Sequence, residues 1–268
     1  MTKKTILDQM GRKIEINENP SRIVSLVPSL TELLYFYSMD DQIKGVTEYC
    51  AFPAEKTQKV AKVGGPKTLN IELIRELNPD LIIASKEENT KKQVEALEKE
   101  FPVWISDVCS LEDAYKMIEK IGHICNKKDL AQNLSSNIEK SMELLHYKSN
   151  IKVAYLIWEN PYMTAGKNTL INDIINKLGF NNVFEHYNRY PRITSKEISE
   201  SKADFILLPS EPYHFTASHM DKFKKLCPQS KILLVNGQFF SWYGNRLLLA
   251  VNYFKTIANV IKTLYGQK

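Results

Sequence analysis

Two stretches decide the fold of this chain: TLNIELIRELNPDLII at residues 68–83 and TSKEISESKADFILL at residues 194–208. Each reads as a polar helix start, an early glutamate, a short helix, and then an aspartate that opens an apolar run. A short apolar run bounded by turn residues is typical of a buried strand. The two stretches match with a one-residue gap, so the chain contains the same helix–strand module twice.

Further strands repeat at a constant spacing. The apolar runs at Arg22 and Lys152 lie 130 residues apart, and so do those at Val103 and Leu233. Strands that alternate with helices predict parallel βαβ units, so the fold class is α/β with two similar parallel-sheet lobes. Ligands of such sheets bind at the carboxyl ends of the strands, and pockets favour places where domains meet. We therefore expect a ligand cleft between the lobes.

Length and composition narrow the class of protein. The chain has 268 residues, of which 43% are hydrophobic and 25% charged, as in a globular protein with room for two domains. Its net charge of +5 comes from scattered Lys and Arg rather than from one basic stripe, which argues against a nucleic-acid partner. No stretch approaches the roughly 20 apolar residues of a membrane span. Residues 1–8 are basic but have no apolar run behind them, unlike a signal peptide.

The segment between the lobes has a helical pattern. From residue 110 to residue 148 there are few helix breakers, and apolar residues recur at helical spacing on both sides of a charged stretch at residues 126–129. Unbroken, such a helix extends some 50–60 Å at about 1.5 Å per residue. We expect three parts: an N-terminal α/β lobe at 1–109, a long connecting backbone helix at 110–148, and a C-terminal α/β lobe at 149–268.

Two local patterns lie near the N-terminus. Residues 5–17 alternate in polarity around Met10 and Gly11, which predicts a β-hairpin. After the strand at residues 22–27, Ser29 and Glu32 stand at the spacing of a capping box, so Ser29 is expected to cap the next helix.

The motifs favour no catalytic or metal site. The four cysteines are scattered without a C-x-x-C, which favours free thiols over a disulfide framework. The run AGKNT at residues 165–169 hints at a phosphate loop, but Pro161 stands where its first glycine belongs. A zinc site built from Glu211, His214 and His219 is a less favoured alternative. We expect no catalytic residue, no resident cofactor and no metal, and a metal-dependent enzyme is the alternative interpretation.

The opening of the first lobe, RIVSLVPSLTE at residues 22–32, resembles the helical-backbone substrate-binding proteins of ABC importers. The resemblance is greatest to those of cobalamin (vitamin B12) importers, with ferric-siderophore and haem receptors as relatives. It covers essentially residues 10–265, and further matching segments lie at residues 45–53, 69–83, 160–167 and 241–246. The family's fold, two α/β lobes joined by one long helix, agrees with the duplication.

The resemblance implies a membrane partner. In the family, one glutamate on each lobe docks to arginines of an ABC permease, and the matching positions here are Glu72 and Glu197. A purely structural role is the alternative, because residues 194–197 form a capping-box pattern and acidic residues in a first helical turn complement the helix dipole.

The implied cleft residues depart from the cobalamin binders. Those proteins place tryptophans around the corrin, and the matching positions here hold Pro66, Ser85 and Arg192. Aromatic residues on loops after predicted strands suit a large planar or metal-chelate ligand, and nearby cations favour an anionic chelate such as a ferric siderophore. The expected ligand-binding residues are Tyr49, Pro66, Lys67, Ser85, Trp158, Tyr162, Tyr190, Arg192, Phe239, Phe240 and Trp242. One of the two adjacent phenylalanines is expected to pack its lobe instead.

The expected function is therefore a monomeric substrate-binding protein that captures a corrinoid, ferric siderophore or haem and delivers it to an ABC permease. A cytoplasmic corrinoid or haem carrier without a permease is the alternative. Localisation stays open at this point, because the family is periplasmic or cell-surface while the start of this sequence, as written, is that of a cytoplasmic protein.

Overall fold

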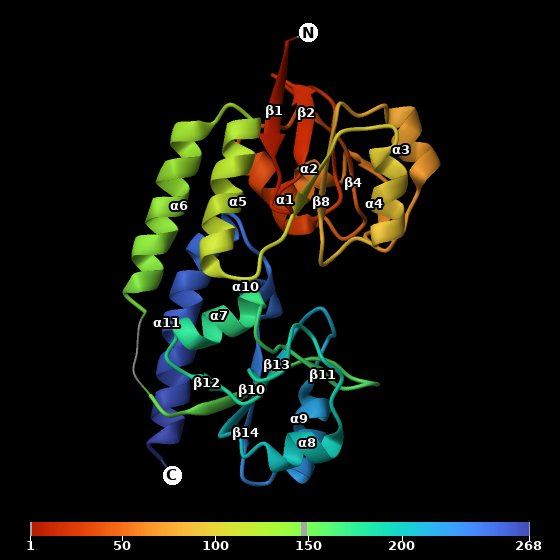
Figure 1. Ribbon diagram of the computed structural model, residues 1–268. Helices are drawn as coiled ribbons and strands as arrows, with labels where there is room; N and C mark the ends of the chain where they lie inside the picture. The colour runs from red at the N-terminus through yellow and green to blue at the C-terminus, as the bar shows by residue number, and fades with distance from the viewer. Residues whose placement is uncertain (1, 146–148, 268) are drawn as a thin grey trace. The chain divides into compact units, whose positions relative to one another are not determined.

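The structure is a computed structural model that describes residues 2–145 and 149–267. No helix among these residues is both long and apolar enough to cross a membrane. The chain divides into two compact units, and the colours of Figure 1 locate their segments by residue number. The first unit comprises Met1–Val108, Glu112–Asn137 and Tyr243–Arg246, and the second comprises Cys109–Leu111, Ile138–Trp242 and Leu247–Lys268.

The first unit is built on a five-stranded parallel sheet with the order β5-β4-β3-β8-β9. A core of Val, Leu and Ile side chains joins one face of this sheet to α3 and α4. The predicted N-terminal hairpin is confirmed as β1 paired with β2. The bounds are β1 Lys3–Leu7, β2 Lys13–Asn17, β3 Ile23–Ser25, α1 Pro28–Phe36, β4 Ile43–Val46, α2 Ala54–Thr57, β5 Ala61–Lys62, β6 Gly64–Gly65, β7 Thr68–Leu69, α3 Ile71–Leu77, β8 Leu81–Ser85, α4 Lys91–Glu98 and β9 Val103–Ser106.

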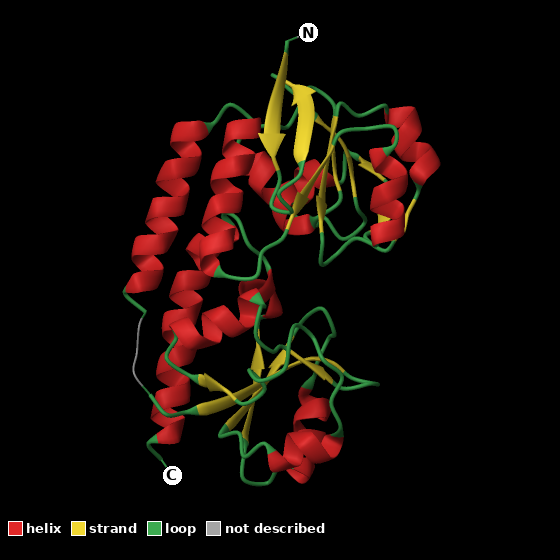
Figure 2. Cartoon of the chain, in the orientation of Figure 1, coloured by secondary structure: helices red, strands yellow, loops and turns green. Residues whose placement is uncertain are grey.

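The second unit repeats this plan. Its sheet has the order β11-β10-β13-β14, with β12 also paired to β10, and α8 and α9 pack on one face through a second apolar core. Figure 2 shows helices and strands alternating in both units. The bounds are β10 Lys152–Trp158, β11 Met163–Thr164, α7 Leu170–Lys177, β12 Asn181–Asn182, α8 Ser195–Glu200, β13 Phe205–Pro209, α9 Ala217–Leu226, β14 Lys231–Val235, α10 Gly237–Ser241 and α11 Arg246–Tyr265.

The duplication and the α/β class predicted from the sequence are confirmed. In both units three neighbouring strands pair in parallel, β3-β8-β9 in the first and β10-β13-β14 in the second. The aspartate that opens each middle strand makes the same kind of hydrogen bond in both units. Asp80 accepts from the N–H of Arg22 at 2.9 Å, and Asp204 accepts from that of Lys152 at 2.8 Å. Each carboxylate thus ties the start of one strand to its neighbour.

The expected single helix at 110–148 is wrong in one respect. The segment is helical, but it forms two helices, α5 (Leu111–Ile124) and α6 (Lys128–Glu143). Asn126 ends α5 in the left-handed region at φ 56°, and the N–H of Lys127 donates to the carbonyl of Gly122 at 2.7 Å, which is a Schellman ending. Residues 146–148 lie outside the described residues.

Gly122 on α5 allows the two helices to pack closely together. A Cβ placed on Gly122 would lie only 2.1 Å from the Cβ of Ala131 on α6. Glycine therefore lets α5 and α6 lie side by side (Figure 1). Since Glu112–Asn137 belongs to the first unit, the unit boundary falls inside α6 rather than at either end of the expected connector.

The capping box predicted at Ser29 is also wrong. Val27 is the N-cap residue of α1 and Pro28 takes the first helical position, so Ser29 lies inside the helix. The Glu32 carboxylate binds the guanidinium of Arg246 instead, with Nε and Oε2 2.8 Å apart. Glu32 thus forms a long-range ion pair rather than the local capping-box hydrogen bonds that the spacing suggested.

Candidate ligand-binding surfaces at the strand ends

An aromatic side chain marks the carboxyl end of β10 in the second unit. Trp158 is the last residue of this strand and is 40% exposed. Its ring meets the ring of Tyr213 edge-on, with centroids 5.4 Å apart. Tyr213 follows β13, the neighbour of β10 in the sheet, so two adjacent strand ends contribute one aromatic surface.

A buried carboxylate lies directly behind this surface. Glu159 is 7% exposed, and its Oε2 lies 3.1 Å from the hydroxyl of Tyr213 and 3.1 Å from Nε2 of His219. Lys222 donates to its other oxygen. Burial alone raises the pKa of Glu159, but the hydrogen bonds from Lys222 and Tyr213 outweigh it and leave this pKa below its usual value.

Tyr162 and Arg192 meet through a backbone contact. Tyr162 lies in the turn between β10 and β11, and its carbonyl accepts from the N–H of Ile193 at 2.9 Å. Met163 and Arg192 form an isolated bridge, and Arg192 itself is exposed. The Tyr162 ring packs on Phe223, with centroids 5.7 Å apart. Tyr190, also predicted to contact ligand, is half-buried in the same segment as Arg192.

The predicted residues of α10 divide into core and surface. Phe240 is 1% exposed and packs between Tyr155 and Phe254, so it belongs to the core, as expected for one of the two phenylalanines. Phe239 is half-buried against Tyr253, with centroids 5.0 Å apart. Trp242, the C-cap residue of α10, donates through its indole N–H to Glu211 at 2.5 Å.

In the first unit the predicted residues are partly buried. Ser85 is 2% exposed, and its hydroxyl accepts from the N–H of Glu87 at 3.2 Å. The Asn89 side chain accepts from the N–H of Ser85 at 2.8 Å and donates to the carbonyl of Pro66 at 3.1 Å, which joins two of the loops. Tyr49 is 66% exposed and Lys67 is also exposed, so these two side chains are the accessible members of the set.

A segment from the far end of the sequence completes this strand edge. The buried hydroxyl of Tyr243 lies 3.1 Å from that of Ser106, the last residue of β9, and burial raises the pKa of Tyr243. Arg246 pairs with Glu32 and lies over the ring of Phe52, 4.3 Å from its centroid. Sequence reasoning missed these contacts, since they join residues 137 and 214 positions apart.

The two glutamates predicted to dock a permease have different surroundings. Glu72 lies in the first turn of α3 with its side chain 77% exposed, and it pairs with Arg75 at 2.5 Å. Glu197 is half-buried and closes the capping box of α8 with Thr194, which confirms the predicted motif. The hydroxyl of Tyr187 and the Thr194 donors lower the pKa of Glu197 to about 2.

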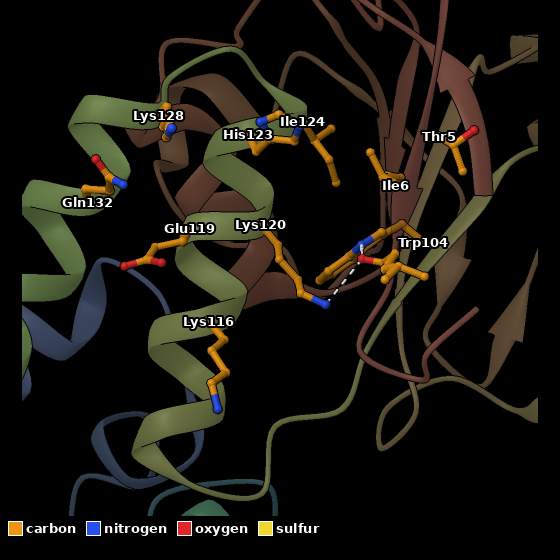
Figure 3. Close-up of a pocket in the computed structure, with 11 residues that line it drawn as sticks. Thr5, Ile6, Trp104, Lys116, Glu119, Lys120, His123, Ile124, Lys128 and Gln132 are labelled. Carbon is orange, nitrogen blue, oxygen red and sulfur yellow. Dashed lines mark hydrogen bonds between the residues drawn. The ribbon is translucent and has the colours of Figure 1, made fainter. Parts of the chain in front are cut away.

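A groove of about 520 Å³ also lies on the first unit, over the exposed face of α5 (Figure 3). Two of its three lysines have partners: Lys116 pairs with Glu112 at 3.0 Å, and Lys120 donates to the carbonyls of Leu7 and Asp8. The groove therefore offers weaker charge complementarity to a ligand than its lysine content suggests.

The alternative zinc set does not gather. Glu211 accepts from the indole of Trp242, while both ring nitrogens of His219 contact other side chains, Nε2 Tyr213 and Nδ1 Thr216. Across residues 2–145 and 149–267, no group of three or more His, Cys, Asp or Glu side chains is arranged to hold a metal ion. None of the four cysteines forms a disulfide.

Two relatives match most of this chain. A vitamin B12-binding protein of Pectobacterium carotovorum subsp. carotovorum (strain PC1) is 24% identical over 239 residues, which is 86% of each chain. An ABC transporter substrate-binding lipoprotein of Bacillus subtilis (strain 168), YvrC, is 27% identical over 216 residues, which is 76% of this chain and 68% of the relative.

Solved structures share the fold. The vitamin B12-binding protein BtuF of Vibrio cholerae superposes with a TM-score of 0.78 at 21% identity, covering 91% of this chain and 98% of that one. The petrobactin-binding protein YclQ of Bacillus subtilis gives 0.80 at 17% identity, covering 97% and 99%. Residues 23–226 match the periplasmic binding protein family. The chain therefore belongs to that family.

Proposed function

We propose that this chain is the substrate-binding protein of an ABC-type importer and that its ligand is a metal chelate. The observation that carries the proposal is the exposed indole of Trp158, held against Tyr213 at adjacent strand ends of the second unit. Parallel sheets bind ligands at this edge. The names of the relatives, which include B12-binding and petrobactin-binding proteins, support the same ligand class.

The chemistry of the surrounding surface favours a large, partly aromatic or anionic ligand. Aromatic rings supply wide contact areas with few rotatable bonds, so they bind planar groups at a low entropic cost. Arg192 is exposed next to the Tyr162 turn, and a guanidinium binds carboxylates and catecholates through two parallel hydrogen bonds. In the first unit, Tyr49 and Lys67 are the exposed residues that we assign to ligand contact.

Binding is tested by titrating cobalamin, haem and ferric siderophores while tryptophan fluorescence is followed. At least one chelate should quench the emission, and Trp158→Ala should weaken its binding by about tenfold or more, since a buried aromatic contact contributes at least about 1.4 kcal/mol. Leu249→Ala is the control, because Leu249 is 59% exposed on α11. If every chelate leaves the wild-type emission unchanged, the proposed ligand class is wrong.

Permease docking is assigned to Glu72 and Glu197, one acidic residue in each of the two equivalent helices. Salt bridges across an interface mainly set orientation and association rate, so alanine at both positions should weaken docking to a permease in nanodiscs while ligand affinity is kept. Glu76→Ala and Glu200→Ala remove exposed acidic residues from the same helices and serve as controls. Undiminished docking of the double variant would reduce both residues to a structural role and favour a soluble carrier.

A further inference from the structure

We propose that Glu159 is the positioning residue of the ligand-binding surface, holding Trp158 and Tyr162 in one arrangement through Tyr213 and Lys222. This inference rests on the proposed function, because it assigns a role in ligand capture to a side chain that is itself 7% exposed. Glu159 contacts no ligand in this account; it acts through its neighbours.

The first set of contacts connects Glu159 to Trp158 through Tyr213. The hydroxyl of Tyr213 donates to Glu159 Oε2 at 3.1 Å, and this bond fixes the direction of the Tyr213 ring. That ring meets the indole of Trp158 edge-on, at an interplanar angle of 67°. An edge-to-face pair adds about 0.5–1.5 kcal/mol beyond area burial, which is enough to favour one rotamer of an exposed indole.

The second set of contacts connects Glu159 to Tyr162 through Lys222. Lys222 donates to Glu159 Oε1, and its ammonium lies 5.1 Å from the centroid of the Tyr162 ring. A free lysine side chain samples many rotamers, so a cation held over a ring needs an anchor. The carboxylate supplies it, and the bond to Glu159 is the largest of the interactions that raise the pKa of Lys222.

Both sets of contacts need a charged group at position 159. One carboxylate serves Tyr213, His219 and Lys222 through its two oxygens, whereas an amide has a single acceptor oxygen. A register shift in the β10–β11 pair lies between Leu156 and Trp158, and such bulges re-aim side chains near sites. The strand end is thereby shaped so that an exposed tryptophan is followed directly by a buried glutamate.

The test uses the full-length protein labelled with 5-fluorotryptophan, whose three indoles give separate ¹⁹F resonances that Trp158→Phe assigns. In Glu159→Gln without ligand, the Trp158 resonance should shift or broaden while those of Trp104 and Trp242 stay in place. Affinity for the chelate that the wild type binds should fall about tenfold, the loss of one hydrogen bond to a charged group.

Two further variants separate positioning from simple charge loss. Asp221→Asn removes an exposed acidic residue that pairs with Lys224 on α9, and it should leave both the resonance and the affinity unchanged. Lys222→Met should weaken binding too. Because Glu159 and Lys222 are coupled, the double variant Glu159→Gln/Lys222→Met should lose less affinity than the sum of the two single losses in free energy.

An unmoved Trp158 resonance in Glu159→Gln would overturn the positioning role. A moved resonance with unchanged affinity would overturn its link to ligand capture. Failure of the proposed function is distinct from both, because the wild-type protein itself would then bind none of the chelates.

Discussion

The two units build equivalent strands but finish them differently. In the first unit, β8 and β9 end at the paired residues Ser85 and Ser106, while in the second β13 and β14 end at the paired Pro209 and Val235. The small hydroxyl of Ser106 accommodates the buried Tyr243, which closes that edge with protein. The second unit instead leaves an indole, Trp158, exposed at the end of β10.

This contrast shows which features a duplicated module keeps. The aspartate that opens each middle strand accepts an equivalent backbone hydrogen bond in both units, because that bond stabilises the sheet itself. The residues at the carboxyl ends differ, since these ends serve closure in one unit and ligand contact, by our proposal, in the other. The requirement for a stable sheet therefore keeps the starts of the strands alike, whereas their ends differ between the units.

The largest effect should come from the ion pair that attaches the far segment to the first unit. Glu32 and Arg246 have side chains only 13% and 9% exposed. Arg246→Met leaves a largely buried carboxylate without this partner, so the free energy of unfolding of the first unit should fall by about 3 kcal/mol. Urea unfolding in a Trp158→Phe/Trp242→Phe background reports on this unit alone, through the buried Trp104.

Lys3→Met is the matched control, because the Lys3–Glu15 pair is 60% exposed on both sides and should contribute less than about 1 kcal/mol. Equal effects of the two substitutions would mean that the segment at residues 243–246 does not depend on Glu32.

A smaller loss of stability is expected when the end of β9 is given the residue found at the end of β14. Ser106→Val places at the end of β9 the residue that stands at the equivalent place in the second unit. The buried Tyr243 hydroxyl then loses a partner, at a cost of about 1–3 kcal/mol. Tyr243→Phe should restore part of that loss in a double-mutant cycle, measured in the same Trp104 background. Strict additivity of the two changes would show that the hydroxyls do not interact.

The smallest expected effect is the contribution of Glu197 to the loss of stability at acidic pH. Its folded-state pKa of about 2 lies below the ordinary value of 4.5, so its contribution to stability is present above about pH 4.5 and is lost as the pH falls toward 2. Glu197→Gln and Thr194→Ala should both make the acid-side fall in melting temperature less steep than in the wild type. Ser199→Ala, on the same helix, should keep the wild-type profile. A wild-type slope in Glu197→Gln would contradict the bonding described for this carboxylate.

Local sequence patterns predicted the features that depend on residues close together in the chain. The apolar runs after Asp80 and Asp204 became strands, and the spacing of Thr194 and Glu197 became a capping box. The same spacing failed at Ser29 and Glu32, because a partner 214 positions away took the carboxylate.

Long-range contacts left no trace in the sequence. The hydrogen bonds of Glu159 to Tyr213 and Lys222 join residues 54 and 63 positions apart, so no periodic pattern in the sequence predicts them. The break after α5 had a local signal, Asn126 before two lysines, since asparagine tolerates the left-handed conformation that ends a helix. Exposed aromatics such as Trp158 were predictable as surface residues only once the strand ends were placed.

The claim that this protein captures a metal chelate is tested most directly by native mass spectrometry. The purified protein is incubated with an equimolar mixture of cobalamin, haem and a ferric siderophore, then freed of excess ligand. We predict one chelate retained at a stoichiometry of one per chain, with retention lost in Trp158→Ala. Ligand-free wild-type protein after incubation with all three would contradict the account.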